Sequence, residues 1–350
     1  MKETTPQVIQ AKMLLNHLFI HYNQAKKKLK KWATPATEKF GLRKKPVLSG
    51  TGLGKLSYPN FSKAALVAFV FFMSQAVTFG QSPGGVTNGF TFWLKPENGV
   101  TTDSNGVTNW DNQWGSGAVS GVFQNDNNHK PAYGIPENNI NFHPTVSFNG
   151  NEVLIQDGIG ADQLHSEQNN AVFMVMESSS DSLSGSSAVT FYSINENSST
   201  DRLRIHNEAS ELINATDAVV AFPEVVGQIQ IRSMFTKEIG SNTQGYFYLN
   251  GDSILSHNIG GDPTLSLLDA ELGIGGIYTI SSSLPWTGNY IYGNIAEVLC
   301  YKETPSLADL EKIHTYLAIK YGSHLAHDYV ASDGAVIWNA TAMAAYHHNV

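Results

Sequence analysis

The sequence predicts an all-β fold, a two-sheet antiparallel sandwich with one short C-terminal helix. Three observations favour it. Beyond residue 84 the chain is rich in Gly, Asn, Ser and Thr with short apolar runs, and turn signals recur about every ten residues. Several runs alternate apolar and polar residues, as strands with one wet face do. Within this part, a helical apolar period occurs once, over residues 307–317.

The first 80 residues differ from the rest. Residues 1–63 carry 13 Lys and Arg against two Glu, a net charge of +11 that leaves −19 for the remainder. We interpret residues 1–62 as a basic leader, partly helical or disordered. Residues 63–80 have the layout of a secretion signal, and their apolar run falls short of the roughly 20 residues of a membrane span. We expect export, with cleavage favoured over a retained anchor and membrane contact only through this segment.

Charge and cysteine content exclude several kinds of function. An acidic body argues against nucleic-acid binding, which needs cationic side chains to displace phosphate counterions. Cys300 is the only cysteine, so an intrachain disulfide and a cysteine-based zinc cluster are both excluded. Because its neighbours are apolar, we expect a buried, unreactive thiol.

The sandwich is placed in residues 84–322. Its predicted strands cover residues 90–94, 100–103, 107–110, 146–148, 153–155, 171–176, 189–194, 202–206, 228–235, 246–249, 254–255, 272–277 and 290–301. The run at 171–176 is apolar throughout, which predicts a strand covered on both faces. The runs at 202–206 and 228–235 alternate, which predicts one solvent-facing side for each.

Turn and loop signals separate these strands. The Asn-Gly pairs at 105–106 and 149–150 predict hairpins. Residues 111–143 become rich in asparagine towards their end and predict a long surface loop. After the sandwich, a turn at Asp333-Gly334 followed by an apolar run predicts the start of a further, truncated module in residues 323–350.

The strand and helix that close the sandwich are both specified locally. Residues 290–301 are rich in β-branched and aromatic residues, and Ala296, Val298 and Cys300 alternate with Ile295, Glu297 and Leu299, which predicts a strand between two covered faces. Pro305 ends the strand, and Ser306 stands where a helix N-cap belongs. The helical period over 307–317 follows, and Gly322 occupies the position of a left-handed C-cap.

Three motifs point to one known family. The strand-to-helix segment contributes Gly293, Ile295, Glu297, Val298, Ser306, Leu307 and Glu311. Residues 246–255, YFYLNGDSIL, look like a hairpin with an Asn-Gly turn, and WLKPENGV followed by NWDNQWGSG surrounds Trp93 and Trp110. In order and spacing these motifs resemble the concanavalin-A-like (laminin-G-like) lectin and glucanase domains of large secreted surface proteins of Gram-negative bacteria. The resemblance covers roughly residues 85–322 and implies a jelly-roll sandwich.

The resemblance also implies what a hydrolase of this fold needs. Such enzymes carry an E-x-D-x-x-E or E-x-D-x-E strand, whose alternate carboxylates face one cleft as nucleophile and general acid. The chain holds no such string. Glu152 and Asp157 are five residues apart, which places them on opposite faces of a strand, and Glu297 stands alone. We therefore expect no enzymatic activity, with a glycoside hydrolase as the less favoured alternative.

Two sets of side chains are candidates for binding. The first consists of aromatic residues that could stack on sugar rings: Trp110, Trp114, Trp286 and Tyr290. Core packing explains at least half of them equally well. The second consists of oxygen-bearing residues around the first hairpin, which could hold calcium as the resemblance implies: Asp103, Asn105, Asp111 and Asn112. The preferred explanation of the second set is that Asp and Asn are good turn residues.

These inferences predict an exported, non-enzymatic module of a cell-surface adhesin that binds an extracellular glycan or a surface protein. The secretion signal, the acidic surface rich in Asn, Ser and Thr, and the missing catalytic carboxylate pair support this prediction. A passive structural spacer, which has no ligand, is the first alternative. A glycoside hydrolase of the same fold is the second.

Overall fold

The computed structural model describes most of the chain beyond residue 81. The described residues are 82–115, 119–156, 163–164, 169–178, 190–195, 201–206, 209–214, 216–221, 226–261, 271–281, 284–288, 290–340 and 342–343. The leader predicted for residues 1–62 and the signal segment predicted for residues 63–80 lie outside them. Among the described residues, no helix is both long and apolar enough to cross a membrane.

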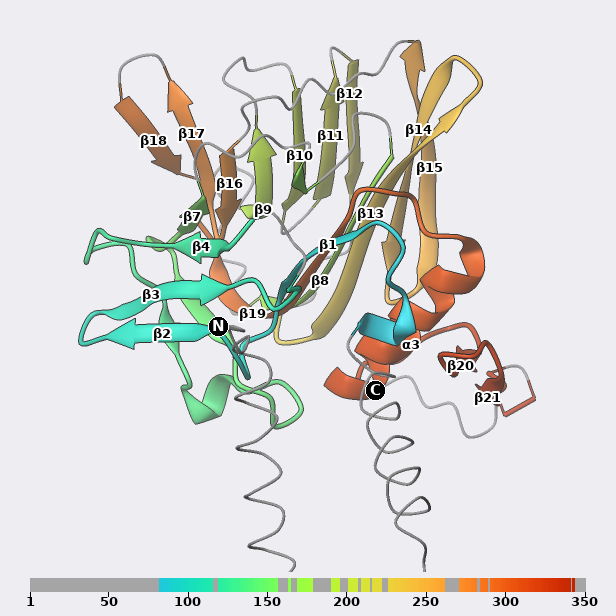
Figure 1. Cartoon of the computed structure of the whole chain (residues 1–350), viewed down its shortest axis with the longest axis horizontal. Helices are drawn as coiled ribbons and strands as arrows, with labels where there is room; N and C mark the ends of the chain where they lie inside the picture. Colours follow the sequence, from blue (N-terminus) through green and yellow to red (C-terminus); the bar gives the residue numbers. More distant parts are fainter. Residues whose placement is uncertain are drawn as a thin grey trace, which may run out of the picture. The chain divides into compact units, whose positions relative to one another are not determined.

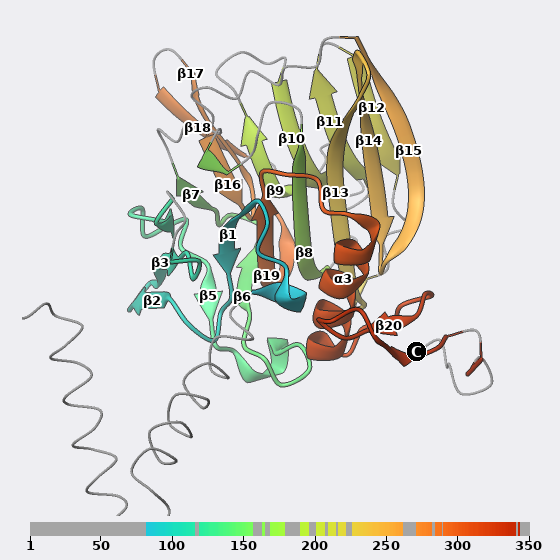
Figure 2. The same ribbon diagram turned by 45° about the vertical axis from the view of Figure 1, so that its right-hand side comes forward.

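The first of two large antiparallel sheets has eight strands (Figures 1 and 2). They run in the order β15-β14-β13-β8-β19-β6-β5, and β1 also pairs with β19. The strands are β1 (Phe90–Leu94), β5 (Ala132–Tyr133), β6 (Val146–Asn149), β8 (Asn170–Ser178), β13 (Ile229–Ile239), β14 (Asn242–Leu249), β15 (Asp252–Gly261) and β19 (Tyr292–Tyr301). β8 pairs along the whole of β19, whereas β6 pairs with its first half and β1 with its second.

The second sheet has nine strands, in the order β12-β11-β10-β9-β16-β7-β4-β3-β2. They are β2 (Val100–Asp103), β3 (Gly106–Asp111), β4 (Gly121–Phe123), β7 (Leu154–Gln156), β9 (Thr190–Asn195), β10 (Asp201–His206), β11 (Ala209–Asn214), β12 (Thr216–Ala221) and β16 (Glu271–Ile274). Two small hairpins complete the strands: β17 (Ile277–Ser281) with β18 (Leu284–Gly288), and β20 (Tyr329–Val330) with β21 (Val336–Trp338). The helical segments within the described residues are η1 (Pro83–Gly85), η2 (Pro136–Asn138) and α3 (Leu307–Tyr321).

The two large sheets share one apolar core. Alternate side chains of the first sheet, such as Leu94, Met174 and Val298, contribute to a single buried cluster with Trp110 and Leu272 of the second. The predicted antiparallel sandwich with a late helix is therefore confirmed, because side chains from both sheets lie in one dry layer. The finer jelly-roll winding stays a prediction. Cys300 is buried in this layer, as expected of its apolar surroundings.

Helix α3 covers the outer face of the first sheet. Its buried face, including Leu310, Ile313 and Leu317, shares a second apolar cluster with Phe173 and Leu299 of β8 and β19. β8 and β19 therefore have both faces covered, as their apolar sequences predicted. The helix ends are also as predicted, since the Ser306 side chain accepts the backbone N–H of Asp309 and Gly322 has a φ of 70°.

One predicted solvent-facing side is wrong. The sequence places Gln230 and Arg232 on the wet face of their strand, but in β13 their exposed fractions are 5% and 0%. They lie on the same face as Met234, which belongs to the layer between the sheets. The guanidinium of Arg232 donates to Oε1 of Gln230 from Nε at 2.9 Å and from Nη2 at 2.7 Å. The two residues expected at the surface therefore form a buried polar pair, in which Arg232 donates and Gln230 accepts.

Two loop predictions also need correction. The Asn149-Gly150 turn joins β6 of the first sheet to β7 of the second, so it is a crossing between sheets and not a hairpin. Here the Glu152 carboxylate accepts the backbone N–H of Asn149 at 2.7 Å. A side chain therefore bonds to the N–H group that would bond to the opposite strand in a hairpin. Residues 111–143 are not one surface loop, because β4 pairs within the second sheet and β5 within the first.

His314 is a titratable side chain of α3 that the fold encloses almost completely. It is 1% exposed, its ring lies 5.5 Å from that of Phe173 and 5.7 Å from that of Tyr248, and Nε2 is 2.8 Å from Oγ of Ser233. Burial, and then the nearby His327, lowers the pKa of His314 from 6.5 to about 3. The folded protein therefore keeps this ring neutral where the unfolded chain takes up a proton.

We expect the free energy of unfolding to fall as the pH drops from about 6.5 towards 3, because only the unfolded His314 gains a proton in this range. This one group gives a slope of at most about 1.4 kcal/mol per pH unit. Urea denaturation at several pH values measures the slope. His314→Gln should flatten it. An unaltered slope in His314→Gln contradicts this assignment.

Candidate ligand-binding site

A polar hollow of about 520 Å³ lies at the tip of the β2–β3 hairpin. Four segments border it: the hairpin turn, the loop that precedes β5, β5 itself, and the turn between β6 and β7. Its polar side chains include Asp103, Asn105, Asn127, Lys130, Asn149 and Glu152. A volume of this size is within the range of small-ligand sites.

Local geometry holds the hairpin tip against the neighbouring loop. Asp103 Oδ1 accepts the backbone N–H of Asn105 at 2.8 Å, which is the usual bond of an Asp at a turn. Gly106 has a φ of 137°, and a Cβ at this position would meet the carbonyl oxygen of Pro131 at 2.5 Å. The next residue, Val107, donates its N–H to the same carbonyl at 2.8 Å. Glycine is therefore required for this close approach.

An ion pair forms one wall of the hollow. The side chain of Lys130 is 5% exposed, and its Nζ donates to Oδ2 of Asp103 at 2.6 Å and to Oδ1 of Asn127 at 2.7 Å. The hydrogen bond from Lys130 lowers the pKa of the Asp103 carboxyl. The pair leaves this wall polar and close to neutral in charge.

Other polar atoms of the hollow have no partner among the described residues. Glu152 is 8% exposed, and its Oε2 accepts two backbone N–H groups, from Asn149 at 2.7 Å and from Asn151 at 3.2 Å, while Oε1 accepts none. The side-chain amides of Asn105 and Asn149 form no hydrogen bond to the described residues. Acceptors and donors therefore face the hollow with unused bonding capacity.

The predicted aromatic platform is divided among different parts of the fold. Trp110 is 0% exposed in the layer between the sheets, so its ring presents no face to a sugar. Trp114 is half-buried on the outer side of the first sheet, with its ring 4.9 Å from that of Phe90. Trp286 lies on β18, but its side chain is outside the described residues.

Tyr290 is the member of the predicted set that lies near the hollow. Its ring stacks on that of His129 at a centroid distance of 5.7 Å, and His129 directly precedes Lys130. The loop after β6 holds His129 in place, because Nδ1 of His129 lies 2.5 Å from the carbonyl oxygen of Asn151. Tyr290 and His129 therefore form a ring pair, and His129 stands in the sequence between the lining residues Asn128 and Lys130.

The four residues considered for calcium do not converge on one point. Asp103 and Asn105 are at the tip of the hairpin, whereas Asp111 is the last residue of β3. Five residues of extended strand separate Gly106 from Asp111, a distance of about 17 Å. The side-chain amide of Asn112 has no hydrogen-bonding capacity left for a metal ion. It bonds to the backbone of four residues: Trp93, Trp114, Thr91 and Val119. Among the described residues, no group of three or more His, Cys, Asp and Glu side chains is placed to hold a metal ion.

Glu297, the lone carboxylate singled out in the sequence, is sealed beneath α3. Its side chain is 0% exposed. Oε1 accepts from Nε1 of Trp93 at 2.5 Å and from the hydroxyl of Tyr316 at 3.0 Å. Oε2 accepts from Nζ of Lys320 at 2.7 Å and from the hydroxyl of Tyr321 at 2.6 Å. Burial, followed by Glu297 itself, raises the pKa of both tyrosines, which therefore stay neutral donors.

Lys320 also joins Glu297 to a second carboxylate at the surface. Its Nζ lies 3.0 Å from Oε1 of Glu97, which in turn lies 2.7 Å from Nδ1 of His143. Burial of Glu97 raises its pKa, but the larger combined effect of Lys320, a backbone hydrogen bond and His143 lowers it. Lys320 thus pairs with both carboxylates, so a structural role explains the network.

Sequence reasoning missed Asn127, Lys130 and Glu152 as parts of one site. Asn127 and Lys130 fall in the stretch predicted to be a surface loop, and Glu152 was considered only as a possible catalytic carboxylate. The asparagine-rich composition of residues 124–139 was the available signal. It could not indicate which of these side chains meet.

Comparisons with known proteins assign neither a family nor an activity. Residues 309–350 match a family described as a domain of unknown function (DUF8202), which takes in most of α3 and the β20–β21 hairpin. This match spans a minor part of the chain. No curated protein matches the sequence at a significant level.

Solved structures resemble the chain only weakly. Domain 4 of AbnA, an extracellular GH43 arabinanase of Geobacillus stearothermophilus solved with arabinotriose, is 12% identical, with 64% of this chain and 98% of that chain covered and a TM-score of 0.40. The binding domain of botulinum neurotoxin serotype D is 16% identical, with 66% and 51% covered and a score of 0.42. A Trypanosoma rangeli sialidase is 13% identical, with 74% and 39% covered and a score of 0.43. The chain thus spans about half or less of the last two.

We expect Glu297→Gln to lower the free energy of unfolding by about 3–5 kcal/mol, because the neutral amide leaves the buried Lys320 ammonium without one of its two anionic partners. Chemical denaturation measures this change. Glu311→Gln is the matched control, since Glu311 lies on α3 outside the network and should change stability little. A loss in Glu297→Gln no larger than that of the control contradicts a structural role for Glu297.

Proposed function

We propose that this protein is a glycan-binding module of an exported surface protein, and that the hollow at the β2–β3 hairpin binds a neutral oligosaccharide. The observation that carries the proposal is the set of polar groups that line the hollow with unused hydrogen-bonding capacity: the Asn105 and Asn149 amides and Oε1 of Glu152. Sugar hydroxyls both donate and accept, so amides and a carboxylate are suitable partners for them.

The charges of the hollow favour a neutral ligand over an acidic one. Lys130 is already paired with Asp103, which leaves the Glu152 carboxylate as the uncompensated charge. An acidic sugar would meet this carboxylate and a body of net charge −19. The Tyr290–His129 ring pair, which includes the neighbour in sequence of the lining residue Lys130, offers an apolar surface on which a sugar ring could rest.

Binding without turnover is the form of this function that we favour. The Glu297 carboxylate is enclosed and bonded to four donors, so a substrate has no access to it. Asp103 and Glu152 both line the hollow, but Asp103 is paired with Lys130, which leaves Glu152 as the one carboxylate there without a cationic partner. Glycoside hydrolysis uses two. We further propose a jelly-roll sandwich and an adhesin role at the cell surface, for which the secretion signal predicted in residues 63–80 is the support.

We expect Asn105→Ala and Asn149→Ala each to weaken the affinity for a neutral oligosaccharide about fivefold to tenfold, because each removes one or two hydrogen bonds. A glycan array that contains neutral and acidic oligosaccharides identifies the best binder. Titration calorimetry with that oligosaccharide then gives the dissociation constants of the wild type and the variants.

Asn139→Ala is the matched control, an exposed asparagine on the loop after η2 and outside the hollow. It should bind like the wild type. Failure of every oligosaccharide on the array to bind would favour the passive spacer. Affinities that stay unchanged in both hollow variants would place the site elsewhere, and release of new reducing ends during incubation would favour a hydrolase.

A further inference from the structure

Five asparagines of the chain directly precede a glycine: Asn88, Asn98, Asn105, Asn149 and Asn250. Asparagine is among the chemically labile residues. A following glycine favours its breakdown, because no Cβ hinders the approach of the glycine nitrogen to the asparagine side chain. All five pairs lie in the described part of the chain, and two of them, at Asn105 and Asn149, line the polar hollow.

The two asparagines of the hollow are free to react. Both are exposed, and neither side-chain amide forms a hydrogen bond to the described residues. Each amide can therefore rotate until its Cγ meets the next backbone nitrogen, with no hydrogen bond to break first. Hydrogen bonds from Lys130 and from the backbone N–H groups of Asn105 and Gly106 lower the pKa of the Asp103 carboxyl. An ionised carboxylate thus lies against the Gly106 N–H.

Two of the other asparagines are held by hydrogen bonds. Nδ2 of Asn88 donates to the carboxylate of Glu303, and Oδ1 of Asn250 accepts the backbone N–H of Ile231 at 2.8 Å. Either amide has to give up its bond before it can turn towards the following glycine. Asn98 is exposed but does not line the hollow, so it is the reference for an exposed pair elsewhere.

We propose that Asn105 and Asn149 are sites of spontaneous deamidation, which converts the amides of the hollow into carboxylates and ends ligand binding. At Asn105, the Gly106 nitrogen bonds to Cγ and passes its proton to the Asp103 carboxylate. The bond from Cγ to the amide nitrogen then breaks, and this nitrogen takes up the proton and leaves as ammonia. Water opens the resulting succinimide ring to aspartate or isoaspartate. One water is consumed and one ammonia is released, and nothing is oxidised or reduced.

The consequence for binding rests on the proposed function, whereas the chemical step does not. Each conversion replaces an amide, which donates and accepts hydrogen bonds, by a carboxylate, which only accepts them. It also adds a negative charge to a hollow that already contains the Glu152 carboxylate. Converted chains therefore bind the oligosaccharide weakly, and the fraction of chains able to bind falls with the age of the protein.

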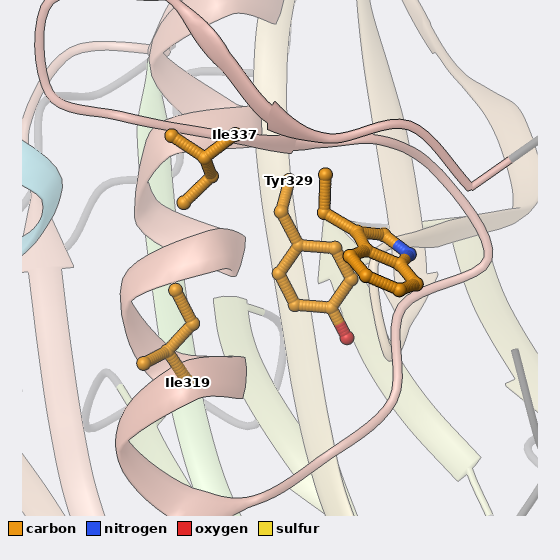
Figure 3. A pocket seen from close by; sticks show the side chains of 4 residues that line it. Ile319, Tyr329 and Ile337 are labelled. Atoms are coloured by element: carbon orange, nitrogen blue, oxygen red, sulfur yellow. The ribbon is translucent and has the colours of Figure 1, made fainter. Parts of the chain in front are cut away.

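An apolar groove on the α3 surface is inert to this reaction. It has a volume of about 330 Å³ and lies between α3 and the β20–β21 hairpin, and Figure 3 shows its four side chains: Ile319, Tyr329, Ile337 and Trp338. None of the four carries an amide or a carboxylate. Deamidation therefore changes the polar hollow and leaves this groove as it is.

Peptide mass spectrometry of the full-length chain measures the chemical step. The chain is incubated in mildly alkaline buffer, folded and in urea, and the converted fraction is followed at all five Asn-Gly pairs. In urea the pairs should react at similar rates. In the folded chain we expect Asn105 and Asn149 to react about tenfold faster than Asn88 and Asn250, the effect of one side-chain hydrogen bond on a rate. Equal rates at these four sites in the folded chain overturn the proposal.

Titration calorimetry measures the consequence, with the oligosaccharide that fresh chains bind best. We expect the number of binding sites per chain to fall in step with conversion at Asn105 and Asn149. Asn105→Asp carries one product from the start and should raise the dissociation constant about tenfold. Asn98→Gln removes the exposed pair outside the hollow and should lose binding with age as the wild type does.

The two measurements fail separately. Full binding by converted chains, or an Asn98→Gln variant that no longer loses binding, overturns the assignment of the loss to the hollow. If fresh chains bind no oligosaccharide, the proposed function fails, and the mass spectra still decide whether the hollow is deamidated.

Discussion

The buried carboxylate of Glu297 joins α3 to the middle of the first sheet. It sits on β19, the strand paired with three others, and accepts hydrogen bonds from side chains of both β1 and α3. An isolated carboxylate in this layer would be strongly unfavourable, so four donors, one of them charged, are needed to offset its desolvation. Three of these donors, Tyr316, Lys320 and Tyr321, come from α3, so their bonds to Glu297 fix the position and the rotation of the helix on the sheet.

The position of α3 determines several surface features. Lys320 extends the network outward to Glu97 and His143, and its carbonyl oxygen holds Asn141. The turn that presents Phe142 is thus attached to the helix end. On another flank, the backbone N–H of Val330 donates to the side chain of Thr315, which holds the β20–β21 hairpin against the helix. The turn at Asn141 and the β20–β21 hairpin therefore both depend on the packing of the helix on the sheet.

The polar hollow depends on a different part of the fold. It is built from connections between strands of both sheets, and its walls are joined by the bonds of Lys130 and by the approach of Gly106 to Pro131. The hollow and the α3 surface share no lining residue. The two parts of the surface are therefore built from separate sets of side chains.

The sequence by itself determined the features that are coded locally: the caps at Ser306 and Gly322, the hairpin at Asn105-Gly106, and the two strands covered on both faces. Each depends on a few adjacent residues. Only the tertiary structure decided that Trp110 is a core residue, that Arg232 lies between the sheets, and that Asn127, Lys130 and Glu152 share one hollow. Burial and contact are set by strands far apart in the sequence, and no local pattern records which distant face will cover a given side chain.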